Sequence, residues 1–265
     1  MIRRLKRIVL LVLAILTIVM IHERVKREMA ETTEEQSDSK TVIVPEAGQV
    51  MSVIRLGTDI TLGRVETNEE KGGVNVILKQ EDGTEQVYTF TDVAADSWYV
   101  NAVNFVVSAQ LMKGMGAEPI FHPEYGVLRE ELTSILYRFT RGEKVEPRFH
   151  FDDVKEEDYF YYPVAWVTNK RLMTGLSPTN FGVGEFLSCE DALVALYRLA
   201  DEPETDGTLQ DYPYAAKVSE SARSAVDWAW KSGLITETEC IWYPPQAISR
   251  AQMALLLLRF STMVG

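Results

Sequence analysis

The segment LREELTSILYRF, at residues 128–139, decides the fold because two related copies of it follow along the chain. The second copy is SCEDALVALYRL at residues 188–199, and the third is SRAQMALLLLRF at residues 249–260. The copies begin 60 and 61 residues apart. So regular a period predicts an array of similar supersecondary units that bury their faces against one another.

Each copy places apolar residues at positions i, i+3, i+4 and i+7, which is typical of one face of a helix. These stripes are Leu132, Ile135, Leu136 and Phe139; Ala192, Ala195, Leu196 and Leu199; and Met253, Leu256, Leu257 and Phe260. A lone helix could not hide such a stripe from water, so we expect three closing helices that face one another in a central bundle. Ser188 and Ser249 are predicted N-caps, with Asp191 and Gln252 completing capping boxes, whereas Leu128 has no capping oxygen.

A second set of landmarks lies upstream in the same register. An aromatic residue inside an apolar run marks each first helix, namely Phe105, Trp166 and Trp228, and at helical spacing these side chains are predicted to be core. Gly114 and Gly175 follow at one equivalent position, and we expect them to end the first helices in the left-handed conformation.

Taken together, these segments resemble the surface-layer homology (SLH) family. Its motif runs from an F-x-D-V start through an A-V-x-W-A helix, a G-L-I-x-G turn and an F-x-P loop to a T-R-A-E cap. The first copy carries FTDV at 90–93, FHP at 121–123 and LREE at 128–131. The resemblance covers residues 90–262 and implies three tandem SLH motifs. It further implies a mainly α fold, a pseudo-threefold spindle around a central three-helix bundle, with ligand grooves between neighbouring prongs.

The resemblance also implies a ligand. In the family, the arginine of the T-R-A-E cap is associated with binding a secondary cell-wall polysaccharide that is often pyruvylated and therefore anionic. Arg129 and Arg250 hold this position, and a guanidinium can pair bidentately with a carboxylate. The alternative is a surface arginine at a helix start, although there its charge opposes the helix dipole. Cys189 stands in the second copy, and a thiol offers no cationic fork, so we expect that groove to bind weakly or not at all.

Other candidate ligand residues surround the arginines. Trp98 lies in a predicted loop, where its ring could stack on a sugar. Asp92, Asp153 and Asp211 could accept hydrogen bonds from sugar hydroxyls, or could instead cap the first helices. The full set of candidate ligand residues is Arg129, Glu131, Asp92, Trp98, Gly114, Arg250, Gln252, Asp153 and Gly175.

Charge and the N-terminus bear on the cellular compartment. Of the 265 residues, the first 27 include seven Lys/Arg and one acidic residue, whereas the remainder holds 20 basic and 38 acidic residues. This acidity argues against nucleic acid as a partner. Residues 8–21 form an apolar run after a basic start, which indicates export, either through a cleaved signal peptide or with a retained membrane anchor. We expect the chain at the cell wall or cell surface.

The chain is expected to divide into six parts. These are a signal peptide or anchor at 1–27, a disordered tether at 28–40, a small β-rich segment at 41–89, and repeats at 90–144, 149–204 and 208–265. Within the β-rich segment we predict strands at 41–44, 50–56, 60–65, 74–79 and 86–90. Gly83 is expected in a hairpin turn. About 50 residues make a marginal core, so we expect this segment to lean on the repeats.

Two functions fit these features, neither of them catalytic and neither needing a cofactor or metal. One is noncovalent anchoring to a wall polysaccharide, and the alternative is a membrane-tethered protein-interaction scaffold built on degenerate repeats. The sequence contains no HExxH, GxSxG, P-loop or GxGxxG unit. Adjacent acids such as Glu130 and Glu131 point apart on a helix and are expected on the solvated surface. Cys189 and Cys240 could form a disulfide in an exported chain, but their separation does not follow from the sequence.

Overall fold

The structure, a computed structural model, describes residues 50–51, 60–116 and 118–263. Its strands are β1 (Val50–Met51), β2 (Ile60–Thr61), β3 (Arg64–Thr67), β4 (Val74–Lys79) and β5 (Glu85–Phe90). The last three form an antiparallel sheet in the order β3-β4-β5, while β1 pairs with β2. The predicted strands at 74–79 and 86–90 are confirmed to within one residue, and Gly83 adopts the expected positive φ of 85°. The predicted strand at 41–44 lies outside the described residues.

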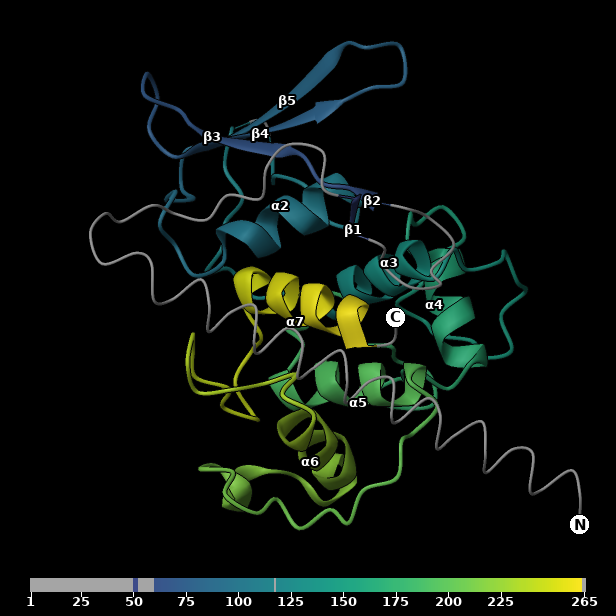
Figure 1. The fold of residues 1–265 in the computed structure, drawn as a ribbon. Coiled ribbons are helices and arrows are strands. Elements are labelled where there is room, and N and C mark those ends of the chain that lie inside the picture. Colours follow the sequence, from purple (N-terminus) through teal and green to yellow (C-terminus); the bar gives the residue numbers. More distant parts are fainter. Residues whose placement is uncertain (1–49, 52–59, 117, 264–265) are drawn as a thin grey trace, which may run out of the picture. The chain divides into compact units, whose positions relative to one another are not determined.

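Helices make up most of the regular structure that follows the sheet (Figure 1). They are α2 (Val100–Ser108), α3 (Arg129–Phe139), α4 (Tyr161–Asn169), α5 (Cys189–Leu199), α6 (Arg223–Lys231) and α7 (Arg250–Met263). Two 3-10 turns, at Ala215–Lys217 and Glu220–Ala222, precede α6. The described residues are therefore mainly α with a small antiparallel sheet, and the third copy opens less regularly than the other two.

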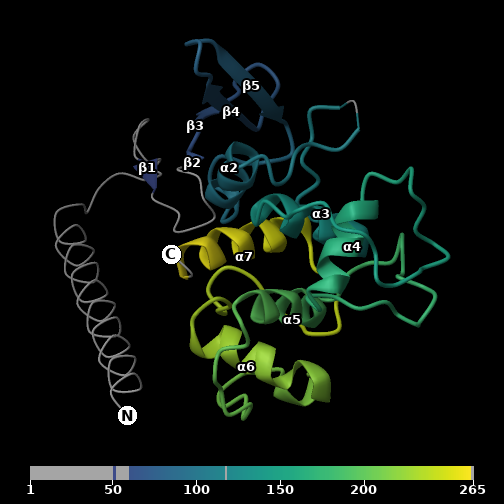
Figure 2. The ribbon, with the colours of Figure 1, turned by 90° about the vertical axis from the view of Figure 1, so that its right-hand side faces the viewer.

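Each first helix packs on the closing helix of a different copy. Helix α4 packs on α3 and α6 packs on α5, so in both cases a first helix contacts the closing helix that precedes it. Helix α2 packs on α7, which closes the chain. The two ribbon views place α3, α5 and α7 between α2, α4 and α6 (Figures 1 and 2). The copies consequently depend on one another, because a first helix buries its apolar face on its neighbour's closing helix.

The apolar stripes of the closing helices are buried as predicted. Every stripe residue except the half-buried Leu199 is among the core side chains. Phe139 at the end of α3 and Phe260 in α7 approach to 5.9 Å between ring centroids. The aromatic residues of the first helices, Phe105, Trp166 and Trp228, are also core, which confirms that prediction.

An arginine near the end of each closing helix binds that helix to the turn of its own copy. In all three cases a guanidinium Nη donates to the carbonyl oxygen of a buried leucine six residues after the first-helix aromatic. The pairs are Arg138 with Leu111 at 2.7 Å, Arg198 with Leu172 at 3.4 Å, and Arg259 with Leu234 at 3.2 Å. The three copies therefore share one internal fastening.

The β-sheet leans on the first copy, as expected for so small a segment. Val74, Val76 and Phe90 belong to the same buried cluster as α2. Asn104 of α2 donates to the carbonyl oxygen of Gly63 at 2.8 Å, and the Gly63 amide donates to the Ser108 hydroxyl at 2.9 Å. Asn104 is buried, so these hydrogen bonds fix the position of the sheet on α2.

The closing helices begin largely as predicted. Ser249 and Gln252 form a reciprocal capping box, with bonds of 3.2 and 2.9 Å. At α5 only half of the predicted box forms, because the Ser188 hydroxyl accepts from the Asp191 amide at 3.1 Å while the Asp191 carboxylate does not bind the Ser188 amide. At α3, where Leu128 has no capping oxygen, the Glu131 carboxylate accepts from the Leu128 amide at 2.9 Å. Half of a capping box therefore suffices there.

The prediction for the ends of the first helices is wrong. Gly114 and Gly175 are not left-handed; the left-handed positions are Gln110, Arg171 and Gly233, which come directly after the C-caps. The two predicted glycines lie further along, where space excludes a side chain. A Cβ at Gly175 would lie 2.6 Å from the Phe151 ring, and one at Gly114 would lie 2.8 Å from the Ile120 carbonyl oxygen.

Within the part of the chain that the structure describes, no helix is both long and apolar enough to span a bilayer. The predicted signal peptide or anchor at 1–27 and the predicted tether at 28–40 lie outside the described residues.

Candidate functional site

Arg129 is buried at the junction between the first two copies, not exposed at a helix start. It is the first residue of α3, yet its Nε donates to the Phe181 carbonyl oxygen at 3.0 Å and its Nη2 to the Thr174 carbonyl oxygen at 2.6 Å. Its guanidinium lies 5.2 Å from the centroid of the Phe181 ring. Carbonyl oxygens and an aromatic face thus compensate a cation that the helix dipole alone would disfavour.

Arg250 repeats this geometry between the third copy and the first. Its Nε donates to the Phe121 carbonyl oxygen at 2.8 Å and its Nη2 to the Lys113 carbonyl oxygen at 2.6 Å. The Phe121 ring centroid lies 4.7 Å away. The alternative of a surface arginine is therefore wrong at both positions, since each residue is about 5% exposed.

Both guanidinium groups keep donors beyond these bonds. A guanidinium has five N–H groups, and two serve the backbone carbonyls, so three are left for other acceptors. Burial lowers the pKa of Arg129, while Asp191 and other nearby carboxylates oppose that shift. The Asp191 carboxylate lies 4.0 Å from Nη1 of Arg129. An arginine of this kind stays protonated at all physiological pH values, so the junction presents a fixed positive charge.

A small cavity of about 120 Å³ opens at the Arg129 junction. Its lining brings the two predicted ligand residues Arg129 and Gly175 together with the neighbouring turn and with α5. Asp191 and Arg198 also line it, although neither is among the predicted ligand residues. Arg198 could have been recognised, because it is the arginine that recurs in every closing helix.

At the position of Cys189, a tyrosine replaces the missing arginine. Trp242 precedes Arg250 by eight residues, as Phe121 precedes Arg129 and Phe181 precedes Cys189, so an arginine at 189 would be expected to reach the Trp242 carbonyl. In the structure the Tyr212 hydroxyl donates to that oxygen. Tyr212 is buried, and desolvation followed by nearby Cys189 raises its pKa. At this junction the donor to the carbonyl oxygen is therefore a neutral side chain instead of a cation.

The two cysteines at this junction are free thiols. Burial raises the pKa of Cys189 to about 12 and that of Cys240 to about 11. Both are therefore protonated at neutral pH, and the possible disulfide is not formed in the structure.

The aspartates at the start of the first two copies hold loops in place and do not cap helices. The Asp92 carboxylate accepts from the amides of Phe121 and His122, at 2.8 and 2.7 Å. Neither α2 nor α4 has a side-chain cap at its start, so the N-cap alternative is wrong. The loop that supplies the carbonyl oxygen to Arg250 is thus held in place by Asp92.

Asp153 does the same for the loop at Arg129. Its carboxylate accepts from the amides of Phe181, Gly182 and Val183, each at 2.8 Å. Burial raises the pKa of Asp153, but these three bonds outweigh it and hold the pKa below its usual range. Asp211 in the third copy is exposed and left-handed, with a φ of 62°, so it has a different setting.

The remaining predicted residues are not gathered at the cavity. Glu131 and Gln252 form the capping contacts of α3 and α7, and Gln252 also donates to the Ile241 carbonyl oxygen at 2.8 Å. Trp98 is partly exposed and packs edge-on against Tyr99. Gly114 follows Lys113, whose carbonyl oxygen accepts from Arg250.

Glu130 differs from the expectation of a solvated surface acid. It is about 6% exposed, and its carboxylate accepts from the Gly184 amide at 3.1 Å. The start of α3 abuts the loop of the next copy, which buries this side chain. Among the described residues, no cluster of three or more His, Cys, Asp or Glu side chains could hold a metal ion.

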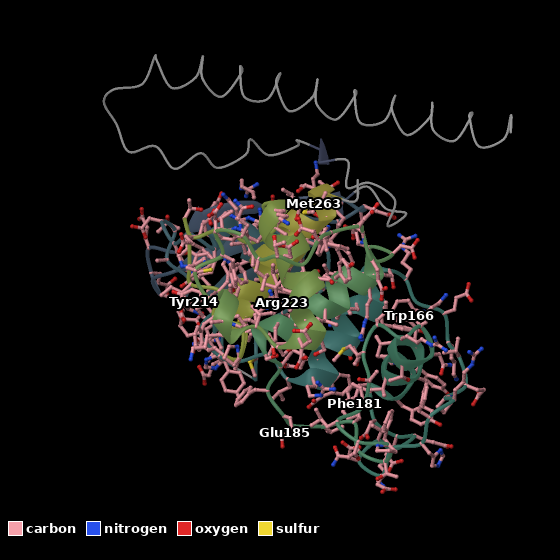
Figure 3. All side chains as sticks on the ribbon, turned by 90° about the horizontal axis from the view of Figure 1, so that it is seen from below. Trp166, Phe181, Glu185, Tyr214, Arg223 and Met263 are labelled. Carbon is pink, nitrogen blue, oxygen red and sulfur yellow. The ribbon has the colours of Figure 1, made fainter. Side chains whose placement is uncertain are left out.

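The comparisons with known proteins bear on this geometry. Residues 89–133 match the S-layer homology domain. The match contains Asp92, Gly114 and Arg129, and it ends inside α3. Phe181 and Trp166 of the second copy lie apart from Tyr214 of the third copy (Figure 3). All three residues lie beyond the matched range.

A curated relative points in the same direction. The chain is 29% identical over 140 residues to the "Surface-layer 125 kDa protein" of Lysinibacillus sphaericus. The aligned region is 52% of this chain and 12% of that protein. About half of this chain thus aligns with a small part of the relative's length, and one S-layer homology domain is matched at residues 89–133.

Proposed function

We propose that this chain is a noncatalytic cell-surface protein that anchors itself noncovalently to an anionic polysaccharide of the cell wall. The S-layer homology domain at residues 89–133 and the resemblance to a surface-layer protein support a role at the cell surface. The observation that carries the proposal further is the Arg129 junction, where a buried, fixed cation borders a cavity.

The proposal includes three SLH motifs around a pseudo-threefold axis. It is supported by the shared arginine fastening of the closing helices and by first helices that pack on the closing helix of another copy. Short antiparallel bridges also link the loops before the closing helices, joining Leu128 to Phe186 and Ser188 to Ala247. A third bridge joins Gly126 to Ser249. Every copy therefore contacts both of the others.

The chemistry of the junction favours a carboxylate-bearing sugar. Arg129 offers donors to an anion, and its own orientation is held by two backbone carbonyls and by the ring of Phe181. Preorganisation of this kind lowers the cost of binding, because the side chain does not need to be ordered. Gly175 also lines the cavity, and Asp191 could accept a sugar hydroxyl. Arg250 offers the same fork at its own junction.

A sedimentation experiment with purified walls tests the proposal. Residues 44–265, which form one compact unit, are mixed with walls of Lysinibacillus sphaericus before and after extraction of the wall polysaccharide. We expect retention on intact walls and its loss on extracted walls. Equal retention on extracted peptidoglycan would contradict a polysaccharide ligand.

The second candidate function is a protein-interaction scaffold built on degenerate repeats. It is favoured by the junction at Cys189, where Tyr212 occupies the carbonyl that an arginine would contact. On this reading the other two arginines are structural only. A chain that fails to sediment with intact walls but co-purifies with one stoichiometric partner protein would favour the scaffold.

A further inference from the structure

The second copy contains a larger cavity that the arginine junction does not explain. Its volume is about 620 Å³, within the roughly 300–1,000 Å³ of small-molecule sites. It lies between the end of α4, the loop after it and the end of α5. We call it the aromatic pocket and define it by Phe149, Phe151, Arg171, Gly175, Pro178 and Arg198.

The aromatic pocket adjoins the cavity at Arg129. Four residues line both spaces, namely Met173, Thr174, Gly175 and Arg198. The turn at Thr174 and Gly175 therefore separates two neighbouring compartments, and Thr174 also holds Arg129 through its carbonyl oxygen. The next unit of a chain-like ligand bound at Arg129 would have to cross this turn to enter the aromatic pocket.

Aromatic and charged groups in the aromatic pocket fit a sugar. Phe149 is half exposed and stacks on the buried Phe151, with 6.4 Å between centroids and 18° between ring planes. Its ring is thereby held as a flat apolar surface, suited to the apolar face of a pyranose. Arg171 and Arg198 supply two cations against the single carboxylate of Glu202, so the lining carries a positive excess in an acidic chain.

This aromatic platform is particular to the second copy. Counting back from the starting aspartates, Phe149 corresponds to Tyr88 in the first copy and to Gly207 in the third. Tyr88 lies in β5 and pairs with Val76 of β4, whereas Gly207 has no side chain. The asymmetry is not needed for the fold, because the neighbouring core position is apolar in every copy: Phe90, Phe151 and Leu209 are all buried.

We propose that the aromatic pocket is a second saccharide subsite, which holds the sugar unit next to the one bound at Arg129. The inference rests on the proposed function, since it assigns both compartments to one wall polysaccharide. The chain would then recognise at least two consecutive units at this junction, with stacking on Phe149 and hydrogen bonds from Arg171 and Arg198.

Fragment length separates the two subsites in an experiment. Wall polysaccharide of Lysinibacillus sphaericus is hydrolysed, and fragments of one sugar unit and of several consecutive sugar units are titrated into residues 44–265 by calorimetry. We expect Phe149→Ala to weaken binding of the longer fragments by about three- to tenfold and to leave the single unit unchanged. Arg171→Gln should act in the same direction, whereas Arg129→Gln should weaken both fragments.

Phe186→Ala is the matched control, because Phe186 is similarly exposed but lies outside the aromatic pocket. Unchanged binding of the longer fragments by Phe149→Ala, or an equal loss with Phe186→Ala, overturns the second subsite alone. If the unaltered chain binds no fragment of any length, the proposed function fails and the subsite fails with it.

Discussion

The junctions at Arg129 and at Cys189 solve one structural problem with different chemistry. At both, a carbonyl oxygen of the next copy's loop needs a donor. Arg129 supplies a charged fork that reaches two carbonyls, whereas Tyr212 supplies one neutral hydroxyl from the loop's own copy. The comparison shows that the fold requires a donor but does not require a cation. A cation at this position therefore invites a functional explanation.

Truncation of Arg129 and of Cys189 to alanine should have unequal effects on stability. Arg129→Ala leaves two carbonyl oxygens without their donor, so we expect a loss of about 2–4 kcal/mol in the free energy of unfolding. Cys189→Ala leaves no carbonyl oxygen without its donor, so we expect the free energy of unfolding to fall by only about 1 kcal/mol. Urea denaturation of both variants measures the difference, and equal losses would contradict the stated contrast between the junctions.

Removing the substitute donor is expected to have a smaller effect. Tyr212→Phe keeps the buried ring and removes only the hydroxyl that donates to Trp242, so we expect a loss of about 1–2 kcal/mol. Tyr214→Phe is a suitable control, because Tyr214 packs on Tyr212 without contacting that carbonyl. If both variants are as stable as the parent chain, Tyr212 does not replace the arginine.

The loop at the Arg129 junction should be sensitive to acid. The pKa of Asp153 is lower in the folded state than in the unfolded chain, so its contribution is fully present above about pH 4. That contribution is lost as the pH falls through the lower folded pKa. We therefore expect Asp153→Asn to cost about 1 kcal/mol at pH 7 and the difference from the parent chain to shrink toward pH 2. A difference that stays constant over this range would contradict the role of the carboxylate.

The sequence predicted the repeated scaffold well and the site less well. The stripes in the closing helices and the first-helix aromatics follow from periodicity, which burial then enforces. Periodicity could not reveal that Asp92 and Asp153 would fasten loops, since those contacts join residues about 30 positions apart. The compensation by Tyr212 was equally hidden, because it depends on which loop lies beside Cys189.

The thiols provide the smallest expected effect. Cys189 is almost fully buried and its pKa is raised to about 12, so it should resist iodoacetamide at pH 8 until the chain unfolds. Cys240 is less buried and should react slowly, given a pKa raised to about 11. Mass spectrometry of the alkylated protein checks both thiols. A mass two hydrogens lower with no alkylation would mean that the two cysteines pair instead.

The most direct test of the central claim compares Arg129 with a structural arginine on the same helix. Arg138 also donates to a backbone carbonyl oxygen but lines neither the cavity at Arg129 nor the aromatic pocket. Affinity for intact walls is measured for Arg129→Gln and Arg138→Gln at a temperature where both are folded. We expect Arg129→Gln to bind at least about tenfold more weakly and Arg138→Gln to bind like the parent chain. Equal affinities for all three proteins would contradict the assignment of Arg129 to a wall polysaccharide.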